Sequence, residues 1–175
     1  MKNKLQNAGI LVILLSIVGG SLFSFWRTQV FSKNQAVPIL CYHKISTDPD
    51  PMSISPERFK EQLVALKEMG YHSIGLKELG DLWELGKEPA PGSVVITFDD
   101  GYENNYSMAQ PILEEQGFSA TVFVITNRDF RNDLLSWDEI SELRAKGWGI
   151  GSHSWSHVDL AIRPAWSSWR SGQCA

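Results

Sequence analysis

Four uniformly apolar runs recur along this chain of 175 residues, and they constrain its fold more than any other feature. They cover residues 37–43, 94–98, 119–126 and 148–152. Short runs without polar alternation are typical of strands that are buried on both faces. Amphipathic segments separate them, so strand and helix alternate along the chain. This order predicts an α/β fold in which helices cover a parallel sheet.

The helical segments carry recognisable start and stop signals. Ser55 can cap a helix whose first position suits Pro56, and Gly70 ends it. Ser136 and Glu139 form the sequence pattern of a capping box. Helices are therefore predicted at residues 55–70, 76–85, 103–116 and 136–147, with Pro111 disturbing the middle of the third, and a short fifth strand at 72–74.

Polar side chains follow the apolar runs at the points where strands end. His43 ends the first run, Asp99 and Asp100 follow the second, and His153 follows the last. Ligands of parallel α/β folds bind beyond the carboxyl ends of the strands. The sequence therefore predicts a functional site at this edge.

Two adjacent carboxylates, Asp99 and Asp100, leave the strand at 94–98 in "VVITFDDGYENN". Such close negative charges repel, so they need a cation, a shared proton or open water. Gly101 would let the chain turn so that the two carboxylates can serve different roles. By itself the pair fits a solvated turn, or a magnesium site of a phosphoryl-transfer enzyme.

The segment "HSWSH" places His153 and His157 four residues apart, at a predicted corner between strand and loop. Two histidines and a carboxylate are a common ligand set for catalytic zinc. A pair of histidines at this spacing also occurs by chance as surface or structural residues. The aspartates and histidines together favour a metal-dependent hydrolase, because a cation would compensate the carboxylates and the carboxylates would complete its coordination.

These two segments, "TFDDGYENN" and "GSHSWSH", resemble the first two motifs of the polysaccharide deacetylases, the NodB-homology group or carbohydrate esterase family four. The resemblance extends to "PILCYHKI", "GYHSIGLKEL", "ATVFV" and "LSWDEISEL", and it spans residues 37–160. It implies a hydrolase that removes N-acetyl groups from peptidoglycan, chitin-type or poly-N-acetylglucosamine polymers, as in bacterial cell-wall and carbohydrate metabolism.

The resemblance also implies roles for individual residues. Asp99 would be the catalytic base, and Asp100, His153 and His157 would bind a divalent metal, zinc first, with cobalt or nickel as alternatives. Two further residues are candidates for lining the sugar groove, each with a structural alternative: His43 and Trp155. Cys41, inside the first apolar run, is expected to be a buried, unreactive thiol.

Charge and hydropathy differ between the first 36 residues and the rest of the chain. The first 36 residues hold four basic and no acidic residues, so the remainder holds 12 basic against 20 acidic ones, a net charge of −8. This excess of acidic residues argues against nucleic acid as a partner.

Residues 8–26 are apolar and long enough to span a bilayer, so a signal anchor is predicted, with a cleaved signal peptide as the alternative.

The resulting organisation is a cytoplasmic N-terminus at residues 1–7, a transmembrane helix at 8–26, a linker at 27–36 and an extracytoplasmic deacetylase domain at 37–160. The lysines before the apolar run favour this orientation in the cell membrane. Its partners would be the bilayer and an extracellular N-acetylated glycan. The sequence does not indicate an oligomeric state.

The later motifs of the resembling family cannot be placed in this sequence. Residues 161–175 form an atypical tail without the period of a helix or a strand. A closed α/β barrel takes at least about 200 residues. We therefore expect an incomplete (β/α) barrel in a truncated or frame-shifted chain. The alternative function is an inactive remnant that at most binds metal or glycan; a magnesium-dependent phosphatase is less favoured, because magnesium sites rarely recruit two histidines.

Overall fold

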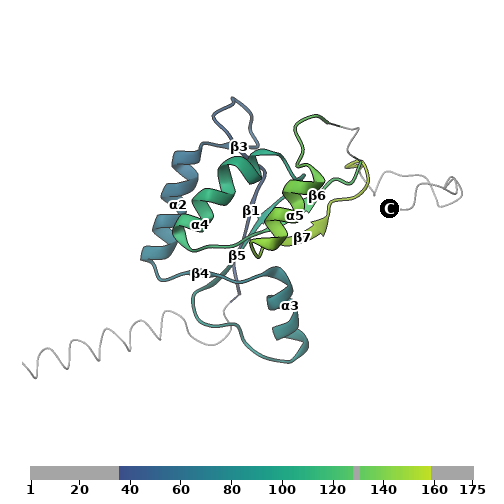
Figure 1. Cartoon of the computed structure of the whole chain (residues 1–175). Helices are drawn as coiled ribbons and strands as arrows, with labels where there is room; N and C mark the ends of the chain where they lie inside the picture. The colour runs from purple at the N-terminus through teal and green to yellow at the C-terminus, as the bar shows by residue number, and fades with distance from the viewer. Residues whose placement is uncertain (1–35, 128–130, 159–175) are drawn as a thin grey trace, which may run out of the picture. The chain divides into compact units, whose positions relative to one another are not determined.

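The computed structural model describes residues 36–127 and 131–158, and it confirms the predicted alternation of strands and helices (Figure 1). The strands are β1 (Ile39–Tyr42), β2 (Lys44–Ile45), β3 (Ser53–Ile54), β4 (His72–Ser73), β5 (Ser93–Phe98), β6 (Thr121–Val124) and β7 (Gly149–Ser152). The helices are α2 (Pro56–Glu68), α3 (Leu76–Glu84), a π-helical turn η1 (Asn105–Ala109), α4 (Gln110–Gln116) and α5 (Trp137–Ala145).

Five of these strands form one parallel sheet in the order β1-β5-β6-β7, with β4 paired to the beginning of β5. The register of β1 on β5 runs from Ile39 opposite Val95 to Tyr42 opposite Phe98. On the other side, β6 pairs with β5 and β7 pairs with β6. The carboxyl ends of β5, β6 and β7 therefore lie at one edge, which carries the site.

Burial follows the position of each strand in this sheet. All six residues of β5 are buried, as its apolar run predicts. In contrast, β1 alternates between exposed and half-buried residues, and the side chains of Ile39 and Cys41 are exposed. The prediction of a buried first strand with a buried Cys41 thiol is therefore wrong. The reason is that β1 lies at the edge of the described sheet, where one flank has no neighbouring strand.

The helices cover the sheet through two separate apolar clusters. Val94, Ile96 and Phe98 of β5 belong to the main core, together with buried side chains of α2, α4 and α5. Val95 points to the opposite face and packs in a smaller cluster with Leu79 of α3. Figure 1 shows the same division, with α2 and α4 side by side and α3 apart from them. The alternation of side chains along β5 thus decides which helix covers which face.

The predicted capping residues are confirmed at the N-termini of α2 and α5. The Ser55 hydroxyl accepts a hydrogen bond from the Arg58 backbone, and Pro56 occupies the first turn of α2. Ser136 and Glu139 form a complete capping box at the start of α5. The predicted third helix differs, because its first part is the π-helical turn η1 and Pro111 lies in the first turn of α4.

Residues 46–54, for which the sequence predicts neither a helix nor a strand, contain strand β3, which pairs in parallel with β2. Sequence reasoning missed this pair, since two residues are too few for a periodic pattern. Of the described residues, none belongs to a helix long and apolar enough to cross a bilayer. The predicted transmembrane helix at residues 8–26 and the tail at 161–175 lie outside the described residues.

Candidate metal centre

The first half of the site is a tight turn directly after β5. Asp100 has a left-handed backbone with φ of 70°, and Gly101 follows with φ of 73°. A Cβ atom at residue 101 would lie 2.9 Å from Cγ1 of Val124 in β6, so the position has no room for a side chain. The predicted role of Gly101 in turning the chain is therefore confirmed. The turn directs the Asp100 carboxylate inward, where its side chain is only 8% exposed.

The second half of the site is the loop after β7, which the end of β6 holds in place. The His153 amide donates to the Val124 carbonyl at 2.8 Å, and the Thr126 amide donates to the Ser154 carbonyl at 3.1 Å. The Ser154 hydroxyl accepts from the His157 amide at 3.0 Å, which closes the turn between the histidines. Ser154 and His157 are both left-handed, so the predicted corner between strand and loop is confirmed.

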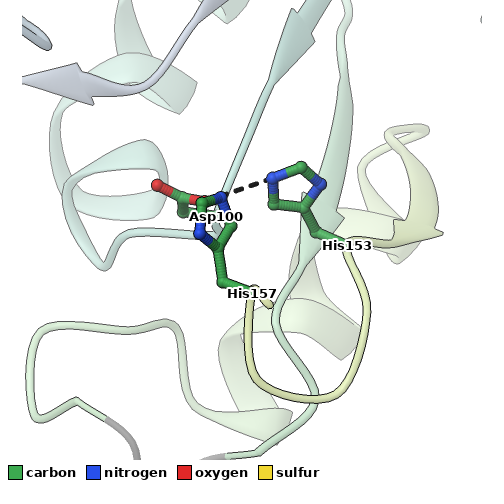
Figure 2. A group of neighbouring side chains, drawn as sticks. All are labelled: Asp100, His153 and His157. Carbon is green, nitrogen blue, oxygen red and sulfur yellow. Dashed lines mark ion pairs between the residues drawn. The ribbon is translucent and has the colours of Figure 1, made fainter. Parts of the chain in front are cut away.

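These two halves bring three side chains together. Oδ1 of Asp100 lies 3.3 Å from Nε2 of His153 and 3.3 Å from Nε2 of His157. Figure 2 shows both imidazoles directed at this carboxylate from the same loop. The two rings are 4.9 Å apart between centroids and inclined by 53°. In the part of the chain that the structure describes, this is the group of side chains that could hold a metal ion.

The geometry fits a tetrahedral cation. Zn²⁺ bound at about 2.0–2.1 Å separates neighbouring ligand atoms by about 3.3–3.4 Å. Both distances from Asp100 match this separation, whereas a good N–H···O hydrogen bond would be shorter. Oδ1 of Asp100 is also buried without a hydrogen-bond partner. A buried carboxylate oxygen without a partner is unfavourable, and a cation between the three side chains would remove that penalty.

Asp99 extends in a different direction from its neighbour. Its backbone amide donates to the Tyr42 carbonyl at 2.9 Å, which continues the pairing of β5 with β1. Its Oδ2 accepts a hydrogen bond from the Cys41 thiol at 3.4 Å. Partial desolvation and the negative charge of Asp99 raise the pKa of Cys41, whereas a hydrogen bond from Thr97 lowers it. Asp99 is half-buried and does not join the three-residue group.

The two candidate sugar-lining residues lie near the same edge. The His43 carbonyl accepts a hydrogen bond from the buried Asn105 side chain at 2.7 Å, which fixes the turn between β1 and β2. The Trp155 side chain is 46% exposed, so it does not pack in the core. Its carbonyl accepts from the Asn127 amide at 2.8 Å. Neither side chain makes a contact that identifies a sugar site.

The sequence did not indicate the contact between Tyr102, which follows the turn at Asp100 and Gly101, and Arg131. Tyr102 is 5% exposed and receives a hydrogen bond from Nη1 of Arg131 at 3.0 Å. The one signal for Tyr102 in the sequence was its position directly after the Asp-Asp-Gly segment. Arg131 lies on an irregular segment, for which hydrophobic patterns make no prediction.

Comparison with known proteins identifies the family. A family model described as polysaccharide deacetylase matches residues 86–171. The YxkH protein of Bacillus subtilis (strain 168), itself assigned to the polysaccharide deacetylases, is 33% identical over 128 residues, which is 73% of this chain and 46% of the relative. The poly-β-1,6-N-acetyl-D-glucosamine N-deacetylase of Staphylococcus epidermidis is 36% identical over 108 residues, 58% of this chain and 37% of that enzyme. The chain thus spans less than half the length of these relatives.

Solved structures agree with the sequence matches. The Streptococcus pyogenes deacetylase PplD, solved in complex with acetate, superposes with a TM-score of 0.67 at 29% identity, over 73% of this chain and 60% of that chain. IcaB from Ammonifex degensii gives a TM-score of 0.64 at 27% identity, over 70% and 55%. The fold, the family model and the sequence relatives agree, and this chain belongs to the polysaccharide deacetylase family.

Proposed function

We propose that this chain carries the metal-binding part of the active site of a polysaccharide N-deacetylase. The observation that carries the proposal is the buried Oδ1 of Asp100, which has no hydrogen-bond partner and lies 3.3 Å from both imidazoles. The substrate would be an extracellular N-acetylated polysaccharide, such as peptidoglycan or a chitin-type polymer. Poly-β-1,6-N-acetylglucosamine is the first polymer to test, because several relatives are named for its deacetylation.

In this proposal Asp100, His153 and His157 hold a divalent cation, zinc in preference to cobalt or nickel. When bound, the cation supplies Lewis acidity, which polarises the amide carbonyl and acidifies water. A cation held by these three side chains would keep a coordination position for water or substrate. The His153 and His157 side chains are 31% and 54% exposed, whereas that of Asp100 is 8% exposed. The substrate would therefore approach from the side of the histidines.

Asp99 is the proposed general base. It is half-buried and adjacent to Asp100, yet its carboxylate is directed toward Cys41, so it remains free of the three-ligand group. An aspartate outside the ligand set can accept a proton from water at neutral pH and return it to the leaving amine. The left-handed turn at Asp100 is what separates the directions of the two neighbouring carboxylates.

The test is acetate release from N-acetylglucosamine oligomers by the full chain, with and without EDTA. We expect release that EDTA abolishes and added Zn²⁺ restores. D99N should keep zinc and lose about 100-fold or more of the rate, since general bases contribute about 10²–10⁴-fold. D100N should lose both zinc and release.

A matched control for these substitutions is D81N. Asp81 pairs with Lys77 on the surface of α3, away from the site, so the same carboxylate-to-amide change should leave zinc binding and acetate release unchanged. Release that persists in D100N with EDTA would contradict a metal-dependent reaction at this site.

The alternative function, a chain that binds metal or glycan without turnover, makes a different prediction. It expects zinc binding that D100N abolishes, and no acetate release from any oligomer. The two candidates therefore differ in turnover and agree on the metal site.

We also propose that the domain acts outside the cytoplasm, held at the membrane by residues 8–26. The support is the apolar length of that segment, the lysines before it and the extracellular location of the proposed substrates. Protease accessibility of the domain in intact cells tests this: digestion only after lysis would contradict it.

A further inference from the structure

Phe123 is a large aromatic residue that the hydrophobic core does not use, although it lies in strand β6 between β5 and β7. Its neighbours in the chain, Val122 and Val124, are buried in the main core, whereas Phe123 is half-buried. Among the described residues, Phe123 belongs to none of the three apolar clusters. Core packing therefore does not explain this side chain.

The ring of Phe123 lies over β7, where Gly151 leaves room for it. The two residues are opposite each other in the register of β6 and β7. A Cβ atom at residue 151 would lie 2.5 Å from Cδ1 and 2.6 Å from Cε1 of Phe123, which is closer than carbon atoms can approach without a shift. Any larger residue at position 151 would therefore displace the ring.

Phe123 shares a face of the sheet with the proposed general base. Alternate residues of a strand point to opposite faces, and residues opposite each other in neighbouring strands share a face. Thr97 of β5 lies opposite Cys41 of β1 and Thr121 of β6. Phe123 follows Thr121 by two residues and therefore points to that same face. The Asp99 carboxylate contacts the Cys41 thiol at 3.4 Å, which places it on this face as well.

The strand order places Phe123 between the two halves of the candidate site. Strand β5 leads into the aspartate pair, and β7 leads into the two histidines. A substrate that reaches both halves must therefore pass over the end of β6. The residues two positions before and after Phe123 are Thr121 and Ile125, which are only 5% and 1% exposed. Phe123 is thus the partly exposed apolar side chain that β6 offers to such a substrate.

The chemistry of an N-acetyl group indicates which part of the substrate Phe123 would meet. The carbonyl carbon carries an oxygen, a nitrogen joined to the sugar, and a methyl group. The oxygen would face the three ligand residues, and the sugar must stay on the solvent side because the polymer continues beyond it. The methyl group is then left to face the sheet, where an aromatic ring provides an apolar contact.

We propose that Phe123 contacts the methyl group of the N-acetyl substrate and limits the size of the acyl group that reacts, while Gly151 sets the position of the ring. This inference rests on the proposed deacetylase function. It narrows the substrate class to glucosamine polymers with short N-acyl groups. In an apolar site, one methylene more or less changes the preference between two substrates by about 10–200-fold.

The test compares kcat/KM of the full chain for glucosamine oligomers that carry N-formyl, N-acetyl or N-propionyl groups, from the release of each acid. The wild-type chain should prefer acetyl over propionyl. F123A removes the ring and should lower this preference by about 10-fold or more. G151A pushes the ring off β7 and should act in the opposite direction, shifting the preference from acetyl toward formyl.

The matched control is I150A. Ile150 precedes Gly151 in β7 and is 37% exposed, but it lies opposite Val122 and therefore on the other face of the sheet. I150A should keep the selectivity of the wild-type chain. Thermal unfolding checks that each variant folds. Should F123A fail to fold, F123L decides, because it keeps an apolar side chain of smaller size: it should lower the acetyl preference, and an unchanged preference would overturn the proposal.

The outcomes separate this inference from the proposed function. A wild-type chain that neither hydrolyses nor binds any of the oligomers would contradict the deacetylase function itself. If the chain binds without turnover, the ratio of dissociation constants from titration calorimetry replaces the ratio of kcat/KM. A wild-type chain that acts on or binds the acetyl oligomer, with unchanged ratios in the Phe123 variants and in G151A, would overturn the role of Phe123 alone. An equal change in I150A would overturn it too.

Discussion

At the scale of single residues, the reactivity of the Cys41 thiol reports on the charge of Asp99, the proposed general base. Cys41 is exposed and its thiol donates to Oδ2 of Asp99 at 3.4 Å, and partial desolvation by the surrounding protein and the charge of Asp99 raise the pKa of the thiol. A raised pKa means less thiolate at any pH below it. In metal-free protein we therefore expect iodoacetamide to label Cys41 more slowly than a free cysteine peptide near neutral pH, with the difference narrowing as the solution becomes alkaline.

Labelling rates of the Cys41 peptide, followed by mass spectrometry, provide the measurement. D99N should accelerate labelling near neutral pH because it removes a negative charge that disfavours the thiolate. D81N serves as the control, because the exposed Asp81 side chain pairs with Lys77 within α3. Equal rates in D99N and wild type would contradict the assigned cause of the shift.

Gly101 supports a second prediction at this scale. G101A would place a Cβ 2.9 Å from Cγ1 of Val124 and keep a left-handed backbone, which costs about 1–3 kcal/mol of unfolding free energy. G80A is the matched control: Gly80 lies inside α3 with open space around its Cβ position, so alanine should stabilise the chain by about 1 kcal/mol. Urea unfolding of both variants should give a lower free energy of unfolding for G101A and a higher one for G80A.

At this scale the sequence predicted which side chains lie together. Strand ends placed Asp99, Asp100 and His153 at one edge, because parallel strands align their carboxyl ends, and the spacing in "HSWSH" placed His157 beside His153. The exposure of Cys41 was not predictable, since it depends on which strand neighbours β1. The contact of Arg131 with Tyr102 was not predictable either, because it joins an irregular segment to a turn across 29 positions.

At the scale of elements, the start of α5 allows a direct test of a predicted cap. The Ser136 hydroxyl accepts from the Glu139 amide at 3.2 Å, and the Glu139 carboxylate accepts from the Ser136 amide at 2.6 Å. We expect S136A to lower the free energy of unfolding by about 0.5–2 kcal/mol. S141A is the control, because Ser141 lies within α5 and its exposed hydroxyl bonds only to the Trp137 carbonyl. A loss in S141A equal to that in S136A would contradict a specific effect of the cap.

Elements with strong local signals were predicted well, and those set by tertiary contacts were not. The cap of α2, the capping box of α5 and the buried run of β5 each depend on a few adjacent residues. The pair β2–β3 instead forms through backbone contacts such as the Lys44 amide with the Met52 carbonyl. The position of Pro111 predicted a disturbed helix, but not that a π-helical turn would precede α4.

At the scale of the whole molecule, a bound ion would join β5 to the loop after β7. A ligand that binds only the folded chain stabilises it by about 2.7 kcal/mol at a concentration of 100 times its dissociation constant. We therefore expect Zn²⁺ to raise the melting temperature of the wild-type chain. EDTA should reverse the increase, D100N should show none, and D81N should behave as wild type. A similar increase in D100N would place zinc elsewhere.

Strand β6 supports this arrangement indirectly, as its position in the described sheet shows. It lies between β5 and β7 and provides no ligand, yet the Ile125 amide bonds to the Asp100 carbonyl and the His153 amide bonds to the Val124 carbonyl. The spacing of β5 and β7 on either side of β6 therefore sets the distance between the Asp100 carboxylate and the two imidazoles. Losing or gaining one residue within 121–124 would turn alternate side chains to the wrong face and shift both anchors. Such length changes in β6 should be as harmful as replacing a histidine, so length variation during evolution should be confined to other segments.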